Sequence, residues 1–221
     1  MDMNIPNGGY TINICIEGNI ACGKSTLLEA IINFPDIAIL PEPIEKWKNY
    51  NGKNMLELMY QNPKKYMYDF QILGQDTISE NHNFITDKKI KIMERSIYSE
   101  RYVFIEMAYH DSNLTFDEYQ KLHHHFTQKS QNITQLDYMV YLRCDPKICY
   151  DRLKKRNRPE EANITLDYLQ KVHDYHEEIF INNQSVLPCN VIVINVNKSV
   201  EEAKSKFLNF IGAFSFKKCG K

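Results

Sequence analysis

Short apolar runs alternate with longer helical stretches along the whole chain. Five runs rich in Ile and Val, each bounded by polar or turn residues, predict buried strands at Ile12–Glu17, Ile37–Leu40, Ile90–Met93, Tyr138–Leu142 and Val191–Val196. The longer stretches between and after them predict helices at Lys24–Phe34, Met67–Asn83, Ser99–Tyr109, Phe116–Lys129, Lys147–Arg156, Leu166–Ile181 and Val200–Phe210. This alternation favours an α/β fold in which helices cover both faces of a five-stranded parallel sheet.

The composition is that of an ordinary globular domain. The chain has 221 residues, 43% of them hydrophobic and 25% charged, so we expect one domain over residues 1–221. The formal net charge of −1 gives no overall field that would attract nucleic acid or an anionic membrane, and we expect neither as a partner. The ends, residues 1–10 and 215–221, carry few apolar anchors, and we expect them to be flexible.

Cysteine use and the lack of targeting signals indicate the compartment. The six cysteines form no CxxC pair and no framework spacing, which is typical of reduced thiols in an intracellular protein. The longest apolar runs fall far short of the ~20 residues that span a bilayer. The first ten residues have neither the apolar segment of a signal peptide nor the Arg and Ser content of a transit peptide. We therefore expect a cytoplasmic protein.

The residues after the first predicted strand have the pattern of a phosphate-binding loop. Gly18-Asn-Ile-Ala-Cys-Gly-Lys-Ser-Thr26 matches G-x-x-x-x-G-K-[ST], and it stands between a predicted strand and a predicted apolar helix. Glycines let successive N–H groups face an anion, Lys24 reaches the β- and γ-phosphates, and the Ser25 hydroxyl can ligate Mg²⁺. Cys22 is interpreted as a small residue that fills space, against the alternative of a redox-active thiol. We expect a nucleoside triphosphate to be bound by Gly18, Asn19, Ala21, Cys22, Gly23, Lys24, Ser25 and Thr26.

Charged clusters follow the second and third predicted strands. Glu42 and Glu45 come after the second strand, and Glu94 and Arg95 end the third. Ligands of open parallel sheets bind outside the carboxyl ends of the strands, so these side chains are expected beside the phosphate loop. Together they supply what phosphoryl transfer needs, namely a carboxylate that accepts a proton, another that holds Mg²⁺, and an arginine that neutralises developing charge. A substrate could bind against nearby aromatic residues and the amide of Gln71.

A basic segment beginning at Arg152 is the strongest cationic cluster of the chain. Arg152 and Arg156 are four residues apart and share a helix face, and Arg158 follows just beyond them. Nucleic-acid binding is the rival interpretation, but one short cluster in a near-neutral chain is a weak footprint. We expect an Arg-rich lid over ATP at about residues 152–162. The run His123–His125 suggests a metal, but consecutive residues point around a helix rather than toward one ion.

The chain resembles the deoxyribonucleoside kinases, a family that includes the deoxycytidine, deoxyguanosine and mitochondrial thymidine kinases and a multisubstrate enzyme. The resemblance runs from Ile12 to about Phe180. It is carried by Glu17–Thr26, Glu42-Pro-Ile-Glu-Lys-Trp47, Asn54–Tyr60, Phe70-Gln71, Met93–Ser99, Arg101-Tyr102, Tyr141–Arg143, Arg152–Glu161 and Leu166–Glu178. It implies a P-loop kinase fold, a homodimer, and Mg²⁺·ATP as the donor that phosphorylates the 5′-hydroxyl of a deoxyribonucleoside.

The resemblance also implies a role for individual residues. Glu42 would be the general base, and Arg95 would steady the 5′-oxygen and the incoming phosphoryl group, with Lys24 as the third catalytic residue. Glu94 would help Ser25 to hold Mg²⁺. Tyr60 and Glu161 would bind the sugar 3′-hydroxyl, and Gln71 would read the base edge. The base would be enclosed by Ile20, Trp47, Phe70 and Phe104, and Arg152, Arg156 and Arg158 would form the lid.

The residues that would select the base depart from the family's usual patterns. Where relatives that prefer deoxycytidine or deoxyguanosine carry Arg and Asp, this chain has Ile78 and Glu100, and Gly74 leaves extra room. Ile78 favours a pyrimidine pocket. Glu100 could accept a hydrogen bond from an exocyclic amine, which favours deoxycytidine or a purine, or it could pair with Arg101. The lid segment most resembles the thymidine kinase branch, so we expect pyrimidines.

Other functions stay open at this point. One alternative is a deoxynucleoside kinase that prefers purines. Another is a catalytically silent protein that binds nucleotides and has a regulatory role. A third is a nucleoside monophosphate kinase of similar architecture. Release of ADP that depends on a nucleoside would distinguish a deoxynucleoside kinase from the silent protein. Turnover with a nucleoside rather than a monophosphate would distinguish it from the monophosphate kinase.

Overall fold

A five-stranded parallel sheet forms the centre of the molecule. The computed structural model describes residues 10–215. Its strands, all paired in parallel, follow the order β2-β3-β1-β4-β5 across the sheet. They are β1 (Ile12–Gly18), β2 (Ile37–Leu40), β3 (Ile90–Glu94), β4 (Tyr138–Arg143) and β5 (Asn190–Asn195). The predicted fold class and all five predicted strands are confirmed, with ends that differ by a residue or so.

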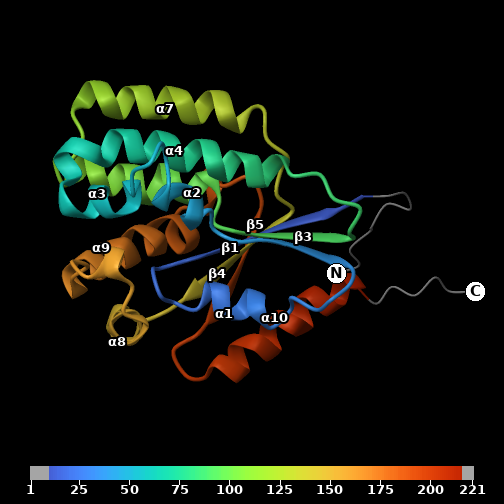
Figure 1. Cartoon of the computed structure of the whole chain (residues 1–221). Coiled ribbons are helices and arrows are strands. Elements are labelled where there is room, and N and C mark those ends of the chain that lie inside the picture. The colour runs from blue at the N-terminus through green and yellow to red at the C-terminus, as the bar shows by residue number, and fades with distance from the viewer. Residues whose placement is uncertain (1–9, 216–221) are drawn as a thin grey trace, which may run out of the picture.

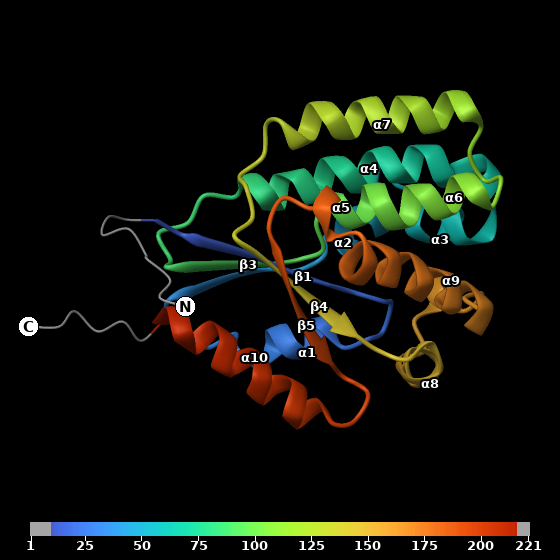
Figure 2. The same ribbon diagram turned by 180° about the vertical axis from the view of Figure 1, so that it is seen from behind.

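Helices cover both faces of this sheet. The helices of more than three residues are α1 (Lys24–Glu29), α2 (Ile44–Lys48), α3 (Met55–Gln61), α4 (Pro63–Asn83), α6 (Glu106–His110), α7 (Phe116–Ser130), α8 (Pro146–Arg156), α9 (Leu166–Glu177) and α10 (Val200–Ser215), and the π-helical η1 (Glu100–Ile105) and η3 (Glu178–Asn182). In Figure 1 and Figure 2, α4 and α7 lie over one face, with α1 and α10 over the other.

Strand residues alternate between two apolar cores, one on each face. Cys15, Met93 and Tyr141 pack with residues of α4, α7 and α9, whereas Ile16 and Leu142 pack with residues of α1, α8 and α10. Successive side chains of a strand point to opposite faces, so residues on both sides of each strand face an apolar core. This is why the strands appear in the sequence as mainly apolar runs, interrupted by a few buried polar residues such as Asn13 and Lys91.

The first helix is shorter than predicted. The sequence predicts a helix over Lys24–Phe34, but α1 ends at Glu29 and the chain continues in turns. The N–H groups of Ile31, Ile32 and Phe34 each bond to the carbonyl three residues back. Pro35 disfavours α-helical geometry in the residue before it, so a helix that continues to the predicted end at Phe34 is disfavoured.

Two other differences concern the segments that bear the site. The short helices α2 and α3 follow the second strand and are absent from the sequence prediction, because five to seven residues give little periodic signal. The predicted helix Ser99–Tyr109 is a composite of a short turn α5 (Ile97–Ser99), π-helical η1 and α6. The predicted helix Leu166–Ile181 likewise consists of α9 followed by η3.

The ends and the cysteines can be compared only in part. Apart from Tyr10 and Ser215, the termini expected to be flexible lie outside the described residues, as does Cys219. The other five cysteines are free, as predicted. In the described part of the chain, no helix is both long enough and apolar enough to cross a membrane.

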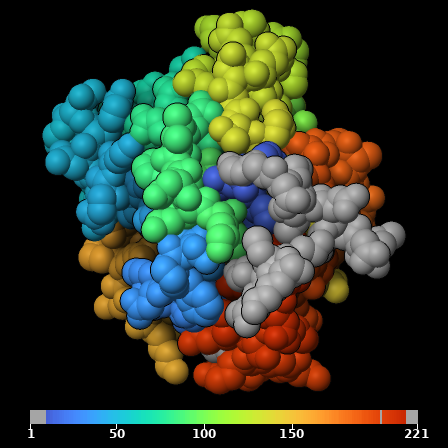
Figure 3. All heavy atoms as spheres, turned by 90° about the vertical axis from the view of Figure 1, so that its right-hand side faces the viewer, coloured from blue at the N-terminus to red at the C-terminus, as the bar shows by residue number. Residues whose placement is uncertain are grey.

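The two ends of the sheet have different surroundings. Figure 3 looks at the end where the strands begin, and there the segment that leads into β2 lies between α10 and the segment that leads into β3. The phosphate-loop sequence follows β1 at the other end, where the strands finish. The functional residues are therefore sought at the carboxyl ends of the strands.

The helix α10 should depend on its buried aromatic anchor. Phe207 is fully buried in the core between α10 and the sheet. Replacing Phe207 by Ala should lower the free energy of unfolding by about 3–5 kcal/mol, because it leaves a cavity. Phe116→Ala is the matched control, since Phe116 is 60% exposed, and it should cost less than about 1 kcal/mol. Urea unfolding measures both values, and equal effects would contradict the prediction.

Candidate functional site

The carboxyl ends of β1, β2 and β3 meet at one cavity. Parallel pairing sets Ile16 beside Glu94 and Gly18 beside Leu142, so the end of β1 lies between the ends of β3 and β4. The cavity has a volume of about 470 Å³ and is lined by residues of the phosphate loop, of the segments after β2 and β3, and of the basic segment. Residues that are far apart in the sequence thus face one common space.

The phosphate loop has the backbone that its glycines permit. Gly18 has φ of 141°, and a Cβ there would lie 2.8 Å from the carbonyl oxygen of Leu142. Gly23, with φ of 111°, stands immediately before α1. Both positions therefore require glycine. The Nζ of Lys24, which is buried, donates to the carbonyl oxygens of Gly18 at 3.2 Å and Asn19 at 3.0 Å.

Cys22 fills space inside the loop. Its side chain is buried, and its Sγ lies 2.9 Å from where a Cβ on Gly18 would be. Burial raises the pKa of the Cys22 thiol, so the thiolate that redox chemistry needs is disfavoured. The geometry supports the space-filling interpretation.

A hydroxyl and a carboxylate lie side by side at the start of α1. The Oγ of Ser25 lies 3.2 and 3.1 Å from the two carboxyl oxygens of Glu94. The Nζ of Lys24 is 3.9 Å from the same carboxyl group. Burial raises the pKa of Glu94, and the charge of Lys24 opposes that effect.

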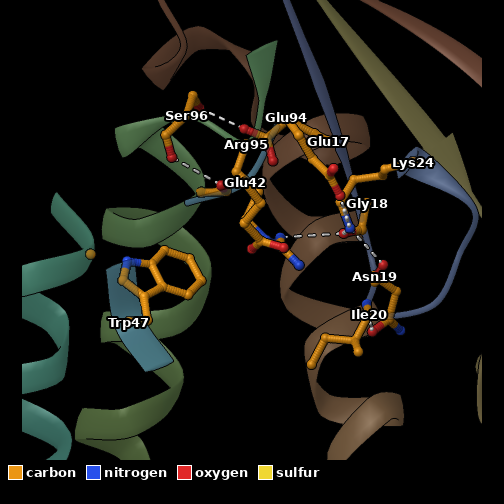
Figure 4. Close-up of polar contacts among 12 residues, drawn as sticks. Glu17, Gly18, Asn19, Ile20, Lys24, Glu42, Trp47, Glu94, Arg95 and Ser96 are labelled. Carbon is orange, nitrogen blue, oxygen red and sulfur yellow. Dashed lines mark hydrogen bonds and ion pairs between the residues drawn. The ribbon is translucent and has the colours of Figure 1, made fainter. Parts of the chain in front are cut away.

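An ion pair between Glu42 and Arg95 lies at the centre of the cavity wall. The Nε of Arg95 donates to Glu42 at 2.5 Å, and one terminal nitrogen donates to the Gly18 carbonyl at 3.4 Å. Figure 4 shows the pair between Trp47 on one side and the loop residues Gly18 to Ile20 on the other. Burial by itself would raise the pKa of Glu42, but the charges of Arg95 and Lys24 outweigh it, and the pKa is lowered. Glu42 is therefore a carboxylate at neutral pH.

Aromatic side chains and one amide form the wall farther from the phosphate loop. Trp47 packs edge-on against Phe70, with ring centroids 5.4 Å apart, and the ring of Phe104 lies 4.7 Å from the guanidinium of Arg95. Gln71 lines the cavity, and its Oε1 is buried without a hydrogen-bond partner among residues 10–215. A buried amide oxygen without a partner is costly, so this one is suited to meet a polar ligand.

Glu100 also faces the cavity, but without a cation in direct contact. It lines the wall, and a Cβ on Gly74 would lie 3.1 Å from its Oε2. Burial raises the pKa of Glu100 to about 8, although the charge of Arg95 opposes this. The side chain of Arg101 contacts Glu106, Tyr119 and His123 instead, so the alternative that Arg101 neutralises Glu100 is wrong.

The basic segment closes the cavity above the phosphate loop. Arg152 donates to the carbonyl oxygens of Cys22 at 2.8 Å and Val196 at 3.2 Å, so it is fixed against the loop and the end of β5. Arg156 donates to both carboxyl oxygens of Glu161, at 2.7 and 2.6 Å, and Arg158 lies 3.6 Å from Glu161. The three arginines and Glu161 all line the cavity.

Comparison with known proteins now identifies the family. A family model described as "Deoxynucleoside kinase" matches residues 14–215. This chain belongs to the deoxynucleoside kinase family. It is thus a phosphotransferase of the family that uses ATP, and the resemblance noted in the sequence is confirmed.

Three curated relatives of this kinase illustrate the range of the family. "Thymidine kinase 2, mitochondrial" of Macaca fascicularis is 40% identical over 197 residues, covering 88% of this chain and 74% of that protein. "Deoxyguanosine kinase, mitochondrial" of Xenopus laevis is 31% identical, covering 85% and 82%. "Deoxycytidine kinase" of Homo sapiens is 29% identical, covering 90% and 87%.

Most of the predicted site residues of this kinase line the cavity. Those that do are Ile20, Ala21, Cys22, Gly23, Lys24, Ser25, Thr26, Glu42, Trp47, Tyr60, Phe70, Gln71, Glu94, Arg95, Glu100, Phe104, Arg152, Arg156, Arg158 and Glu161. Four do not: Gly18 and Gly74 lie behind other residues, Ile78 is in the core, and the Asn19 side chain donates to the Leu169 carbonyl at 2.8 Å.

Some lining residues have no signal in the sequence. Tyr168 of α9 lines the cavity and packs edge-on against Tyr60, with centroids 6.2 Å apart. Met67 and Met107 also line it. An aromatic residue or a methionine on a helix looks the same in a sequence whether it faces a core or a cavity.

The histidines of this kinase serve packing and surface contacts. His123 accepts from Arg101 at 3.0 Å, whereas His125 contacts Asp76 of α4 at 2.9 Å. His176 stacks on both Tyr141 and Phe180, which also stack on each other, and burial lowers its pKa to about 3. Within residues 10–215, no group of three or more His, Cys, Asp or Glu side chains could hold a metal.

The free energy of unfolding of this kinase should decrease as the pH rises, because of Glu100. An unfolded chain loses the Glu100 proton near the ordinary pKa of 4.5, but the folded chain loses it at about 8. Between these values the unfolded state binds fewer protons, so the free energy of unfolding falls by about 1.4 kcal/mol per pH unit. Glu100→Gln removes this loss, so its melting temperature should match the parent near pH 5 and exceed it by at least about 5 °C at pH 8.

Glu45→Gln is the matched control for this measurement. The side chain of Glu45 is 89% exposed, so its replacement should leave the melting temperature close to that of the parent. Scanning calorimetry without ligand measures the melting temperatures of the parent, Glu100→Gln and Glu45→Gln. A difference between parent and Glu100→Gln that is constant from pH 5 to 8 would contradict the prediction.

Proposed function

We propose that this kinase transfers the γ-phosphoryl group of ATP to the 5′-hydroxyl of pyrimidine deoxyribonucleosides. The observation that carries the proposal is the ion pair of Glu42 and Arg95 in a cavity that joins the phosphate loop to the amide oxygen of Gln71, which has no partner among the described residues. A triphosphate at the loop and a nucleoside at Gln71 would meet at this ion pair. In-line transfer needs this kind of positioning together with charge stabilisation.

Glu42 is proposed as the general base. Its pKa is lowered, so the carboxylate is ready to accept the proton of the 5′-hydroxyl. Arg95 would steady the attacking oxygen and neutralise charge on the phosphoryl group in flight, because its guanidinium reaches both Glu42 and the loop. Lys24 would exchange its loop carbonyls for the phosphate oxygens.

The loop and the lid are proposed to hold ATP. The loop would act through the backbone of residues 18–26, and Arg152, Arg156 and Arg158 would close over the phosphates and exclude water. All three arginines line the cavity on the side of the loop. Arg152 contacts the loop carbonyl of Cys22, which supports a role close to the phosphates.

Mg²⁺ is proposed as the metal that accompanies ATP. The hydroxyl of Ser25 and the carboxylate of Glu94 are hard oxygen donors, they lie within 3.2 Å of each other, and both line the cavity. This donor set fits Mg²⁺, which is usually held by one or two protein oxygens together with phosphates. When bound there, Mg²⁺ supplies neutralisation of charge on the phosphate oxygens.

The nucleoside is proposed to bind between the aromatic side chains. Ile20, Trp47, Phe70 and Phe104 would enclose the base, and Tyr60 and Glu161 would bind the sugar 3′-hydroxyl. Gln71 would satisfy its free amide oxygen on the base edge. An amide offers both a donor and an acceptor, so it can pair with thymine or with cytosine.

The preference for pyrimidines is supported by the wall around Gln71. Large side chains, among them Met67, Phe70 and Met107, line the cavity there, which favours a single ring over two. Glu100 fills the space beside Gly74, and its raised pKa keeps it protonated at neutral pH, so it can donate to a carbonyl or accept from an amine. Ile78 would act from the core behind this wall.

Three further expectations stay part of the proposal. The protein would be a single domain, as the sequence predicts. It would form a homodimer, as the resemblance implies. It would act in the cytoplasm, although two of the three relatives above are named as mitochondrial proteins.

Replacing the proposed base should remove turnover but not binding. Glu42→Gln keeps an oxygen that can accept from Arg95 but loses the proton acceptor, so kcat should fall about 10²–10⁴-fold. Release of ADP measures turnover, and isothermal titration calorimetry should show that thymidine still binds. Glu45→Gln, at an exposed position in the same segment, should keep full activity. Full activity of Glu42→Gln would contradict the assignment.

A panel of acceptors tests the substrate class. With ATP and Mg²⁺, kcat/KM for thymidine and deoxycytidine should exceed that for deoxyadenosine and deoxyguanosine by at least about tenfold, because the wall around Gln71 favours one ring. Deoxythymidine monophosphate should give no turnover as an acceptor. Purine values equal to or above the pyrimidine values would refute the preference, and turnover with the monophosphate would refute the acceptor class.

A further inference from the structure

Glu17 is a buried carboxyl group next to the site but not in the cavity wall. It belongs to β1, directly before the phosphate loop, and it is fully buried. One carboxyl oxygen accepts from the Oγ of Ser96 at 2.5 Å and from the Sγ of Cys15 at 3.3 Å. The other oxygen finds no partner among the described residues. Such a costly group is expected where function requires it.

Ser96, the partner of Glu17, fixes the chain immediately after Arg95. Its Oγ donates to Glu17 and accepts from the N–H of Tyr98, which makes Ser96 the N-cap of α5. Its carbonyl accepts from the Oγ of Ser99 at 3.0 Å. Ser96 is therefore held by its side chain and by its backbone.

Arg95 itself has a strained backbone. Its φ is 65°, in the left-handed region, which costs a non-glycine residue about 1–2 kcal/mol. Its N–H donates to the carbonyl of Ile16 on β1 at 3.0 Å. The backbone of Arg95 is thus tied to β1 on one side by its own N–H, and on the other side by the bond from Ser96 to Glu17.

The strained backbone determines where the guanidinium points. From this position the Arg95 side chain reaches Glu42 at 2.5 Å and the Gly18 carbonyl at 3.4 Å, and it lies over the ring of Phe104. An extended or right-handed backbone would send the side chain in another direction. Figure 4 shows Glu17 and Ser96 above the ion pair, on the side away from Trp47 and Ile20.

We infer that Glu17 is a positioning residue which, through its hydrogen bond with Ser96, holds Arg95 in the left-handed conformation that aims the guanidinium into the cavity. The inference rests on the proposed role of Arg95 in phosphoryl transfer. Glu17 touches neither substrate in this arrangement. Its contribution is made before the reactants arrive, because a preorganised group has no orientation to lose in the transition state.

Two variants remove the hydrogen bond between Ser96 and Glu17, one by changing each residue. Glu17→Leu removes the acceptor and leaves the N-cap of α5 intact, and Ser96→Ala removes the donor. Each should lower kcat about ten- to hundredfold, the range expected for one hydrogen bond to a carboxyl group. KM for thymidine and its dissociation constant from calorimetry should change less than about threefold, because the enclosing side chains are untouched.

Two further variants separate positioning from loss of stability. Cys15→Ala removes the other donor to the same carboxyl oxygen without touching Ser96, so it should lower the melting temperature but keep kcat. Glu17→Gln keeps an oxygen that Ser96 can reach, so it should retain kcat within about threefold. If Ser96→Ala and Glu17→Leu do not fold, the comparison of Cys15→Ala with Glu17→Gln still applies, since a loss of kcat in either would contradict the inference.

A double-mutant cycle with Arg95 decides the mechanism. In an Arg95→Gln background, Ser96→Ala should cost no further activity, because the group it positions is absent. Additive losses would overturn the inference. Full activity of Arg95→Gln alone would overturn the proposed role of Arg95. If Arg95→Gln loses activity but Ser96→Ala and Glu17→Leu do not, the role of Arg95 stands and the inference about Glu17 is overturned.

Discussion

The positive charge of Arg95 opposes the effect of burial on the pKa values of three carboxyl groups that have little contact with solvent. Its charge lowers the pKa of Glu42, Glu17 and Glu100 against the effect of burial, and they in turn raise the pKa of Arg95. Glu42, which binds Arg95 directly and is also near the charge of Lys24, has a lowered pKa, whereas the pKa values of Glu17 and Glu100 stay raised. The cations thus keep Glu42 a carboxylate, while Glu100 is a neutral acid in the same cavity at neutral pH.

The sequence predicts the framework of this molecule well. Buried parallel strands are apolar at most positions on both faces, so all five can be recognised, and the loop from Gly18 to Thr26 has a pattern that geometry dictates. Charged residues at strand ends, such as Glu42 and Arg95, could be placed together because strand ends converge in such a sheet. These are the features in which local sequence and global topology agree.

The details that escape prediction depend on contacts between distant segments. Ser96, the hydrogen-bond partner of Glu17, is 79 residues away in the sequence. No sequence pattern near Arg95 predicts its left-handed backbone. Nothing in the sequence of the composite helix after β3 distinguishes its π-helical turn η1 from a regular α-helix. Pro35 disfavours α-helical geometry at Phe34, a local signal that argued against the predicted end of the first helix.

The π-helical turn η1 affects how the cavity wall could change in evolution. A π-turn accommodates one residue more than an α-turn, and it carries both Glu100 and Phe104 into the cavity. Losing one residue from this stretch would restore a regular α-helix and rotate the following side chains by roughly 100° about the axis. The set of groups presented to a ligand would then change in a single step, while the hydrophobic attachment of α6 to its neighbours would have to be rebuilt. Shortening or lengthening the chain here is therefore a coarser route to new selectivity than exchanging one side chain, and the fold resists it.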